Sequence, residues 1–311
     1  MPTTAPTSRL QIAEAHLLER WGATRLAVVA MTIAMLLWPL IEGLGGAVLA
    51  AIPALELIWL RYAVHLTLLL IASRTHAGMT LLRTRYPAVQ VGRSLLMLGM
   101  PVCWLMAAAR MPMPTVMAIF WTTPLFAIAG AALFLHERPS LRETALVVAG
   151  TAGILLVLNP AAPPGRGGPV LALGMSGCYA LYLVATRWLR REPTSVNLFH
   201  TALTVFVVLT PVMPFIWRVP PVSIWGTIVL IGALGLVLLF FVDRALHHAT
   251  VAATAPLGFL QPAAEVVLFG AALGVLPSSL MRVGLLIVAS VVAVCVLRRR
   301  ESAAPSSERP A

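Results

Sequence analysis

The chain has 311 residues, of which 59% are hydrophobic and 11% are charged, and its mean hydropathy is +0.92. Soluble globular domains usually carry about 25% charged residues, so this composition excludes an ordinary soluble domain. The net charge is +11, and all 22 basic residues behind it are arginines, because the chain contains no lysine.

Apolar segments of membrane-spanning length recur along the chain. A hydrocarbon core about 30 Å thick needs roughly 20 apolar residues per helix. The short alternating segments of an outer-membrane barrel do not occur in the sequence. We therefore predict an all-α integral membrane protein with ten transmembrane helices, at 26–45, 54–72, 90–109, 114–135, 142–158, 169–187, 195–216, 223–242, 250–274 and 280–297.

The arginines are distributed unevenly between the connections. If the N-terminus is cytoplasmic, sixteen arginines fall inside and four outside, with Arg61 and Arg93 within or at the edge of spans. This satisfies the positive-inside rule and predicts a bacterial-type inner membrane protein with both termini in the cytoplasm. The charge then indicates contact with anionic lipid at the cytoplasmic face, not binding of nucleic acid.

The chain divides into two halves of five spans each. Residues 1–24 are expected to form a cytoplasmic tail with an interfacial helix, and 299–311 a disordered tail. The Pro/Gly-rich linker 159–168 separates a first unit, 25–158, from a second, 169–298. Because five is odd, the two units insert with opposite topology, which predicts two inverted five-helix repeats around a central cavity.

One segment of the first half has an echo in the second. Residues 107–142 and 245–280 share five identities when offset by 138 positions, including Pro124 with Pro262. Paired proline-interrupted spans in two halves indicate the binding site of a transporter. Pro101, Pro124, Pro256 and Pro262 are therefore predicted hinges.

Polar residues occur in the first two spans. Trp38 and Glu42 lie one turn apart, and Glu42 is either an interfacial carboxylate or a cavity-facing one. Arg61 and His65 are also four residues apart, and a charge at that depth faces water or a partner. Arg61 is either in a structural ion pair, with Glu42 or Glu56, or a substrate contact.

Spans three and four carry aromatic candidates. Trp104 shares a face with two methionines of span three, and Trp121 lies three residues before Pro124. An aromatic residue beside a kink either packs in the core or supports a ligand. The next turn, HERPSLR, contains Glu137, for which Arg138 and Arg142 are the expected partners in a structural latch.

Span nine has a polar stripe on an apolar helix. Thr254, Gly258, Gln261 and Glu265 follow at intervals of four, three and four residues, with Phe259 between them. Glu265 lies several residues from either end, so a neighbouring helix or a cavity must satisfy its carboxylate. The three cysteines lie in separate spans without metal-ligand spacing, so no metal is expected.

Three stretches resemble the EamA-type family of the drug/metabolite transporter superfamily. They are LRYAVHL (60–66), the run from Met111 to Ser140, and the GTAGILLVL ending of span five. Within that family the chain is similar to the branch with riboflavin and S-adenosylmethionine carriers. The second repeat departs from the pattern, with Gly274-Val275 where the first has His136-Glu137. The resemblance implies a ten-helix basket, alternating access and no cofactor.

We therefore expect a secondary carrier for a small organic metabolite, such as an amino acid, vitamin or nucleotide-like compound, or for a drug-like amphiphile, with import, export and proton coupling all open. A functional monomer is expected, with a dimer as the alternative. The other classes considered are an intramembrane or lipid-modifying enzyme and a non-transporting subunit; the lack of a nucleophile–base motif disfavours the enzyme. The predicted substrate-binding residues are Trp38, Glu42, Arg61, Trp104, Trp121, Tyr179, Phe259, Gln261 and Glu265.

Overall fold

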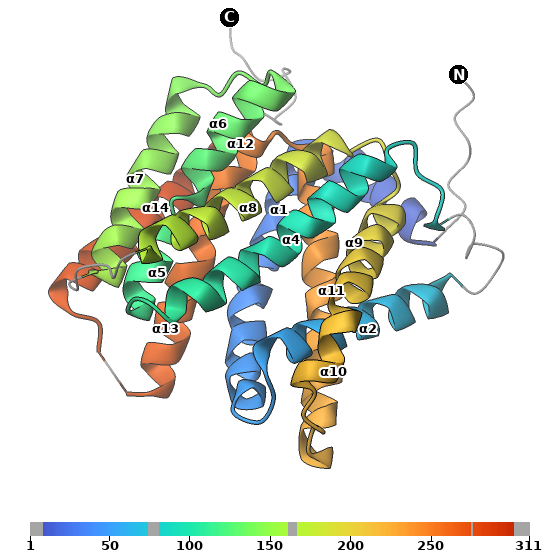
Figure 1. Ribbon diagram of the computed structural model, residues 1–311. Coiled ribbons are helices and arrows are strands. Elements are labelled where there is room, and N and C mark those ends of the chain that lie inside the picture. Colours follow the sequence, from blue (N-terminus) through green and yellow to red (C-terminus); the bar gives the residue numbers. More distant parts are fainter. Residues whose placement is uncertain (1–8, 74–80, 161–166, 275, 302–311) are drawn as a thin grey trace, which may run out of the picture.

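The structure is a computed structural model that describes residues 9–73, 81–160, 167–274 and 276–301 (Figure 1). Within these ranges it contains helices and turns and no strand. Ten helical segments are long and apolar enough to cross a membrane, and each coincides with a predicted span. The predicted all-helical fold with ten membrane-spanning helices is therefore confirmed.

Each half of the chain supplies five of these segments. The first half contains α1 (Arg9–Leu49), α2 (Ala54–Ala72), α4 (Pro87–Ala108), α5 (Met113–Phe120), α6 (Thr123–Leu135) and α7 (Leu141–Leu158). The second half contains α8 (Gly168–Trp188), α9 (Thr194–Leu209), η1 (Thr210–Val212), α10 (Met213–Ile216), η2 (Val222–Ile224), α11 (Trp225–His248), α12 (Val251–Thr254), η3 (Ala255–Phe259), α13 (Leu260–Ala272) and α14 (Ser279–Glu301). Two spans at equivalent places in the two halves are broken, at α5–α6 and at α12–η3–α13, and the α9–η1–α10 span of the second half also contains a 3₁₀ turn.

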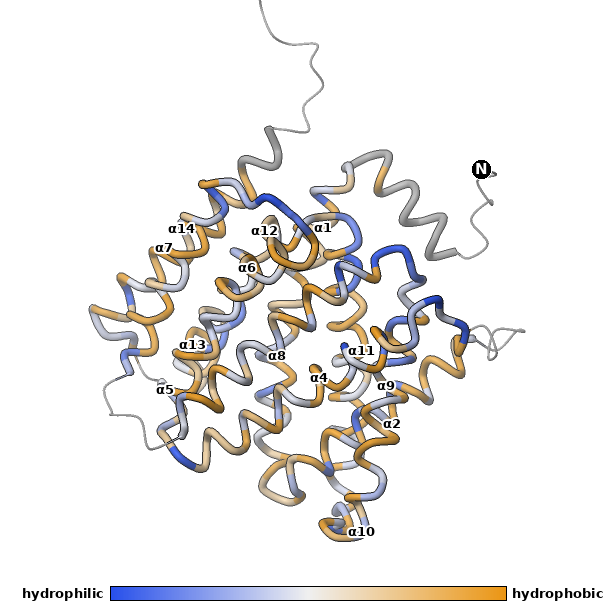
Figure 2. Tube along the Cα trace, turned by 45° about the horizontal axis from the view of Figure 1, so that its top comes forward, coloured by the Kyte–Doolittle hydropathy of each residue, from blue (hydrophilic) through white to orange (hydrophobic). Residues whose placement is uncertain are grey.

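The outside of the bundle is apolar. Most of each helix is hydrophobic, and the long hydrophilic stretches lie in connections between helices (Figure 2). Large apolar side chains point outward; Leu133 and Leu286, for example, are each 68% exposed. Such a surface is stable against lipid tails and not against water, as expected for a protein that spans a membrane.

Helix contacts match when the two halves are exchanged. The α1–α11 contact corresponds to α8–α4, and the α2–α11 contact corresponds to α9–α4. The two broken spans pack in the same way, the second against α1 and the first against α8. The two halves therefore use equivalent helix pairings.

The first helix changes direction before it enters the apolar span. Gly22 has φ 75° and ψ 156°, a conformation that only glycine adopts readily. It separates residues 9–21 from the span that begins at Gly22. The side chains of Leu10, Leu17 and Trp21 lie outside the described residues, as do residues 1–8 and 302–311 and the linker residues 161–166.

The last helices of the two halves, α7 and α14, pack closely along one side of the bundle (Figure 1). A Cβ atom added to Gly284 would lie 2.5 Å from the carbonyl oxygen of Gly153 and 2.9 Å from the backbone nitrogen of Val157. Small residues thus allow backbone-to-backbone contact here.

We predict that Gly284→Ala destabilises the protein by about 1–3 kcal/mol, because the added methyl group forces α14 away from α7. Thermal unfolding in detergent measures the change. Gly226→Ala in α11 is the matched control, since a Cβ there meets nothing within 4 Å. Equal midpoints for the two variants would contradict the close α7–α14 contact.

Candidate functional site

A cavity of about 420 Å³ lies between the two halves of the chain. Helices α1, α2, α4 and α5 of the first half and α8, α11 and α13 of the second line it. Its wall includes Leu49 at the end of α1, Ala54 at the start of α2 and Met113 at the start of α5. The cavity therefore reaches the end of the bundle that carries the α1–α2 and α4–α5 connections.

Eight of the nine residues predicted to bind substrate line this cavity. They are Trp38, Glu42, Arg61, Trp104, Trp121, Tyr179, Gln261 and Glu265, together with the predicted hinge Pro101. Phe259 does not line it. Its side chain is fully buried, with its ring against α7 at Gly150, where a Cβ would lie 2.3 Å from the ring. The absence of a side chain at Gly150 admits the ring there, away from the cavity.

Two carboxyl groups, one from each half, meet at a single amide. The Nε2 group of Gln261 donates to Glu265 at 3.0 Å and to Glu42 at 3.4 Å. The indole of Trp38 also donates to Glu42, at 2.6 Å. Glu42 is exposed to the cavity, and Gln261 is only 2% exposed. Because both carboxyl groups line the cavity, it contains a strongly acidic patch.

Aromatic rings form the wall next to this patch. Trp38 contacts Tyr179 edge-on at 5.3 Å between ring centroids, and Trp121 at 6.4 Å. Phe120 packs against Trp121 at 4.9 Å. Such rings offer a large apolar contact for a planar or amphipathic solute.

Arg61 faces the same cavity without a protein counter-ion. In the described part of the chain no carboxylate oxygen lies within 4.0 Å of its guanidinium group, and none of its nitrogens donates a hydrogen bond. The ion pair with Glu42 or Glu56 considered from the sequence is therefore absent among these residues. Glu56 instead accepts from the backbone N–H of Arg218 at 2.9 Å, because the η2 connection folds back over the start of α2.

The guanidinium group of Arg61 is nevertheless held in place. It lies over the ring of Tyr62, 5.6 Å from the centroid. A Cβ added to Gly235 of α11 would lie 2.8 Å from the Nε atom of Arg61, so the absence of a side chain makes room for the arginine. The cation is therefore positioned in advance rather than free in solvent.

Other polar atoms of the wall have no partner. The indole nitrogen of Trp104 and the Oε1 atom of Gln261 are buried and make no hydrogen bond. An unsatisfied buried donor or acceptor costs roughly 1–3 kcal/mol, so such atoms mark positions where a ligand or water binds.

The first broken span is built around Pro124. Proline removes the hydrogen bond to the carbonyl group four residues earlier, which belongs to Phe120. The hydroxyl groups of Thr123 and Ser176 donate to this carbonyl oxygen instead, at 2.5 and 3.1 Å. Helix α8 thus stabilises the break between α5 and α6, which places Trp121 against the cavity.

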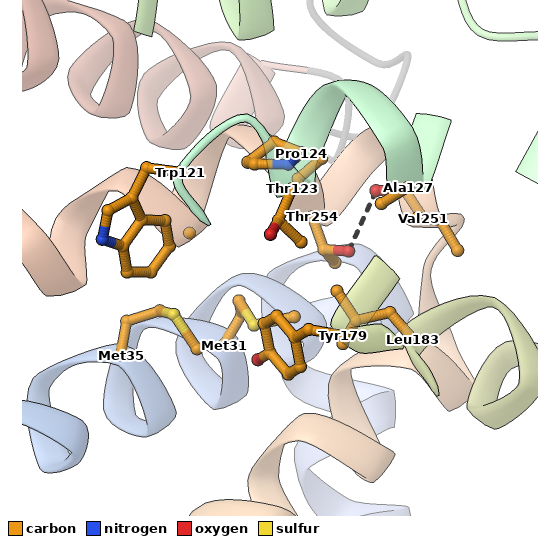
Figure 3. Close-up of a pocket in the computed structure, with 12 residues that line it drawn as sticks. Met31, Met35, Trp121, Thr123, Pro124, Ala127, Tyr179, Leu183, Val251 and Thr254 are labelled. Carbon is orange, nitrogen blue, oxygen red and sulfur yellow. Dashed lines mark hydrogen bonds between the residues drawn. The ribbon is translucent and has the colours of Figure 1, made fainter. Parts of the chain in front are cut away.

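The second break lies beside the first, around a smaller cavity of about 30 Å³ (Figure 3). Pro124, Thr254 and Gly258 line it, and the hydroxyl of Thr254 donates to the carbonyl of Val251 at 3.1 Å. Trp121 and Tyr179 line both cavities. The polar stripe predicted on span nine is therefore divided, with Gln261 and Glu265 in the large cavity and Thr254 and Gly258 in the small one.

The opposite end of the bundle is closed by contacts between the halves. The carboxylate of Glu137 pairs with Arg187 of α8 at 3.0 Å and accepts the N–H of Val251 at 3.0 Å. The expected latch with Arg138 and Arg142 is wrong. The chain turns at His136, where φ is 53°, and this turn directs Glu137 toward the start of α12, where a carboxylate is favourable.

A buried polar cluster joins α4, α8, α9 and α11 near the same end. Arg93 is 1% exposed and donates to Thr186 at 3.2 Å, Thr201 at 2.7 Å and the carbonyl of Asn197. The amide of Asn197 donates to Asp243 at 2.9 Å. Arg93, which the sequence places within or at the edge of a span, is therefore an interior residue, because hydrogen-bonding residues of α8 and α9 surround it.

The sequence reasoning did not identify several residues of the large cavity. Phe120, Met175 and Tyr182 also line it. Tyr182 follows Tyr179 by three residues on α8, so helical spacing was a usable signal; Phe120 and Met175 carried none. Within the described ranges, no group of three or more His, Cys, Asp or Glu side chains is arranged to hold a metal ion.

We predict that Arg93→Met destabilises the protein by about 1–3 kcal/mol, since it leaves the buried acceptors on Thr186, Asn197 and Thr201 without their donor. Unfolding in detergent measures the loss. Arg110→Met is the control: Arg110 is exposed and donates to the carbonyl of Met106, so its change stays within about 0.5 kcal/mol. Equal stability of the two variants would contradict the account of the cluster.

Comparison with known proteins agrees with this architecture. Residues 25–159 match the model of the EamA-like transporter family. A solved crystal structure with 22% sequence identity superposes with a TM-score of 0.72, covering 89% of this chain and 98% of that one. At this identity the superposition establishes a shared fold.

Curated relatives are named as transporters. The chain is 27% identical to a riboflavin transporter of Brucella anthropi over 58% of this chain and 66% of the relative. It is 24% identical to an S-adenosylmethionine uptake transporter of Rickettsia bellii, over 59% and 64%, and 28% identical to a pseudopaline exporter of Pseudomonas aeruginosa, over 64% and 70%. The chain thus spans just under two thirds of the length of the first two. Taken together, the matched family model and these relatives show that the chain carries an EamA-type domain of the drug/metabolite transporter superfamily.

Proposed function

We propose that the protein is a secondary transporter that moves a small organic metabolite across the bacterial inner membrane by alternating access. The observation that carries the proposal is the large cavity between the two halves, which is open toward one end and closed toward the other. It has the size of a small-molecule site, for which roughly 300 Å³ or more is usual. Its wall combines aromatic rings with a few polar groups, as solute sites do.

The charge distribution orients the protein. With both termini in the cytoplasm, the α1–α2 end faces outward and the Glu137–Arg187 pair lies on the cytoplasmic side. The described conformation is then outward-facing. The arginine-rich cytoplasmic connections contact anionic lipid.

The route between the two faces follows the two broken spans. Beyond the large cavity, Trp121 and Tyr179 separate the solute from the small cavity, and the Glu137–Arg187 pair closes the cytoplasmic end. In the inward-facing state, the repeats 25–158 and 169–298 rock about Pro124, Pro256 and Pro262, so these contacts open. The unit that performs this motion is a monomer.

Coupling to protons is assigned to the carboxyl pair. Glu42 and Glu265 belong to different halves and share the Gln261 donor, so a change in the relation of the halves alters both environments. Arg61, Tyr179 and Tyr182 are the other charged or titratable side chains of the cavity lining. The carboxyl pair binds a proton in one of the two conformations and releases it in the other, and this proton movement drives transport of the solute.

The solute belongs to the classes handled by the relatives. Their names record riboflavin, S-adenosylmethionine and pseudopaline, all of which are polar metabolites. A metabolite-wide thermal-shift screen on purified protein, followed by flux measurements in proteoliposomes, tests the function. Solute accumulation in proteoliposomes supports transport; binding without flux of any hit would overturn it.

We predict that Glu265→Gln removes the dependence of solute flux on an imposed pH gradient, while exchange of solute on both sides persists. Gln keeps the size and hydrogen bonding of the side chain but carries no proton. Glu42→Gln has the same effect, to a lesser degree. Glu143→Gln is the control, because glutamine preserves the capping box of α7. Unchanged rate and pH dependence in Glu265→Gln would rule out the coupling role.

A further inference from the structure

The geometry points to a bipolar solute: Arg61 receives an anionic group of the solute, a carboxylate or phosphate, while the acidic patch of Glu42, Gln261 and Glu265 receives a cationic group at the same time. This inference rests on the proposed transport function and narrows its substrate class. The inference predicts that the cavity prefers compounds that carry both charges over neutral vitamins and over simple cations.

Arg61 is a charged side chain without a protein counter-ion among the described residues. A guanidinium group inside a membrane protein is costly unless it is paired or faces a water-filled cavity. Arg61 has neither a carboxylate within 4.0 Å nor a hydrogen-bond acceptor among the described residues. It is nonetheless fixed between the Tyr62 ring and the gap at Gly235. A positioned cation without a partner is a receptor for an anion, and its planar fork suits a carboxylate or phosphate.

Basic and acidic side chains line one cavity. Two carboxyl groups line the same space as Arg61, yet they bond to Gln261 and Trp38 and not to the guanidinium group. The cavity therefore has a cationic side chain and a pair of carboxyl groups on its wall, and these form no direct ion pair. A solute with two opposite charges fits both, whereas a solute with one charge leaves the other uncompensated.

Two buried polar atoms of the cavity wall, on Trp104 and Gln261, make no hydrogen bond with the protein. Trp104 offers a buried N–H donor, which suits an acceptor on the solute. Gln261 offers a buried carbonyl oxygen beside the carboxyl groups, which suits an ammonium donor. The remaining wall of Trp38, Trp121 and Tyr179 accommodates a ring or a hydrophobic body. The solute is therefore an amino-acid-like or phosphate-bearing zwitterion with an apolar or aromatic part.

The test uses ring-bearing compounds that differ in charge. Phenylalanine and S-adenosylmethionine carry both charges, hydrocinnamate only the negative one, tetraphenylphosphonium only the positive one, and riboflavin neither; phenylalaninamide lacks the carboxylate of its parent. Binding to the purified, full-length protein is measured by calorimetry. We expect at least one bipolar compound to bind about tenfold or more tightly than every singly charged or neutral compound.

Variants of Arg61 test whether this residue causes the preference for bipolar compounds. Arg61→Gln weakens the bipolar compound about tenfold or more and leaves phenylalaninamide and tetraphenylphosphonium unchanged, while Arg61→Lys retains part of the affinity because it keeps the charge and loses the fork. Arg110→Gln, an exposed arginine outside the cavity, is the control. Circular dichroism and unfolding midpoints establish that each variant is folded.

Two results would overturn the inference: binding of no bipolar compound, or equal affinity of wild type and Arg61→Gln for the bipolar compound that binds best. Flux of the same compounds in proteoliposomes distinguishes a failure of this inference from a failure of the proposed transport function. If transport is wrong, the charge preference in binding persists without flux. If the role of Arg61 is wrong, flux occurs without the charge preference.

Discussion

Every polar group that enters the membrane must find a partner, and this requirement determines the interior of the protein. The carbonyl of Phe120, which Pro124 leaves without its helical bond, is satisfied by Thr123 and Ser176. The two terminal nitrogens of Arg93 donate to two threonines, a glutamine and a backbone carbonyl. Both sets of contacts join elements distant in the sequence. Broken helices and buried charges therefore tie the two halves together where the interior is closed.

The large cavity concentrates polar atoms whose partners the protein does not supply. Arg61, the indole nitrogen of Trp104 and one oxygen of Gln261 make no hydrogen bond there, whereas the terminal nitrogens of Arg93 donate to several acceptors. The contrast between the two arginines is informative because both lie in apolar helices. One is surrounded by acceptors, and the other has none within the described residues, which is why we propose that it binds a solute.

Much of this arrangement could be predicted from the sequence, and the failures have physical causes. Span length and apolarity predicted all ten helices, and helical spacing with proline positions predicted eight residues of the cavity wall. The partner of Glu137 could not be predicted, since Arg187 lies 50 residues away and the turn at His136 directs the carboxylate. Phe259 was misplaced because its direction depends on Gly150 in another helix. The burial of Arg93 could not be predicted, because Thr186, Asn197 and Thr201, which accept its hydrogen bonds, come from the other half.

A transport pathway with two ends that open in turn is the central proposal, and cysteine accessibility tests it directly. In a chain with Cys103, Cys178 and Cys295 replaced by serine, Gly46→Cys reports on the large cavity and Gly258→Cys on the small one. Oriented vesicles are treated with an impermeant thiol reagent during solute exchange. We predict that Gly46→Cys reacts from the α1–α2 side and Gly258→Cys only from the opposite side. Reaction of both cysteines from the same side alone would contradict alternating access.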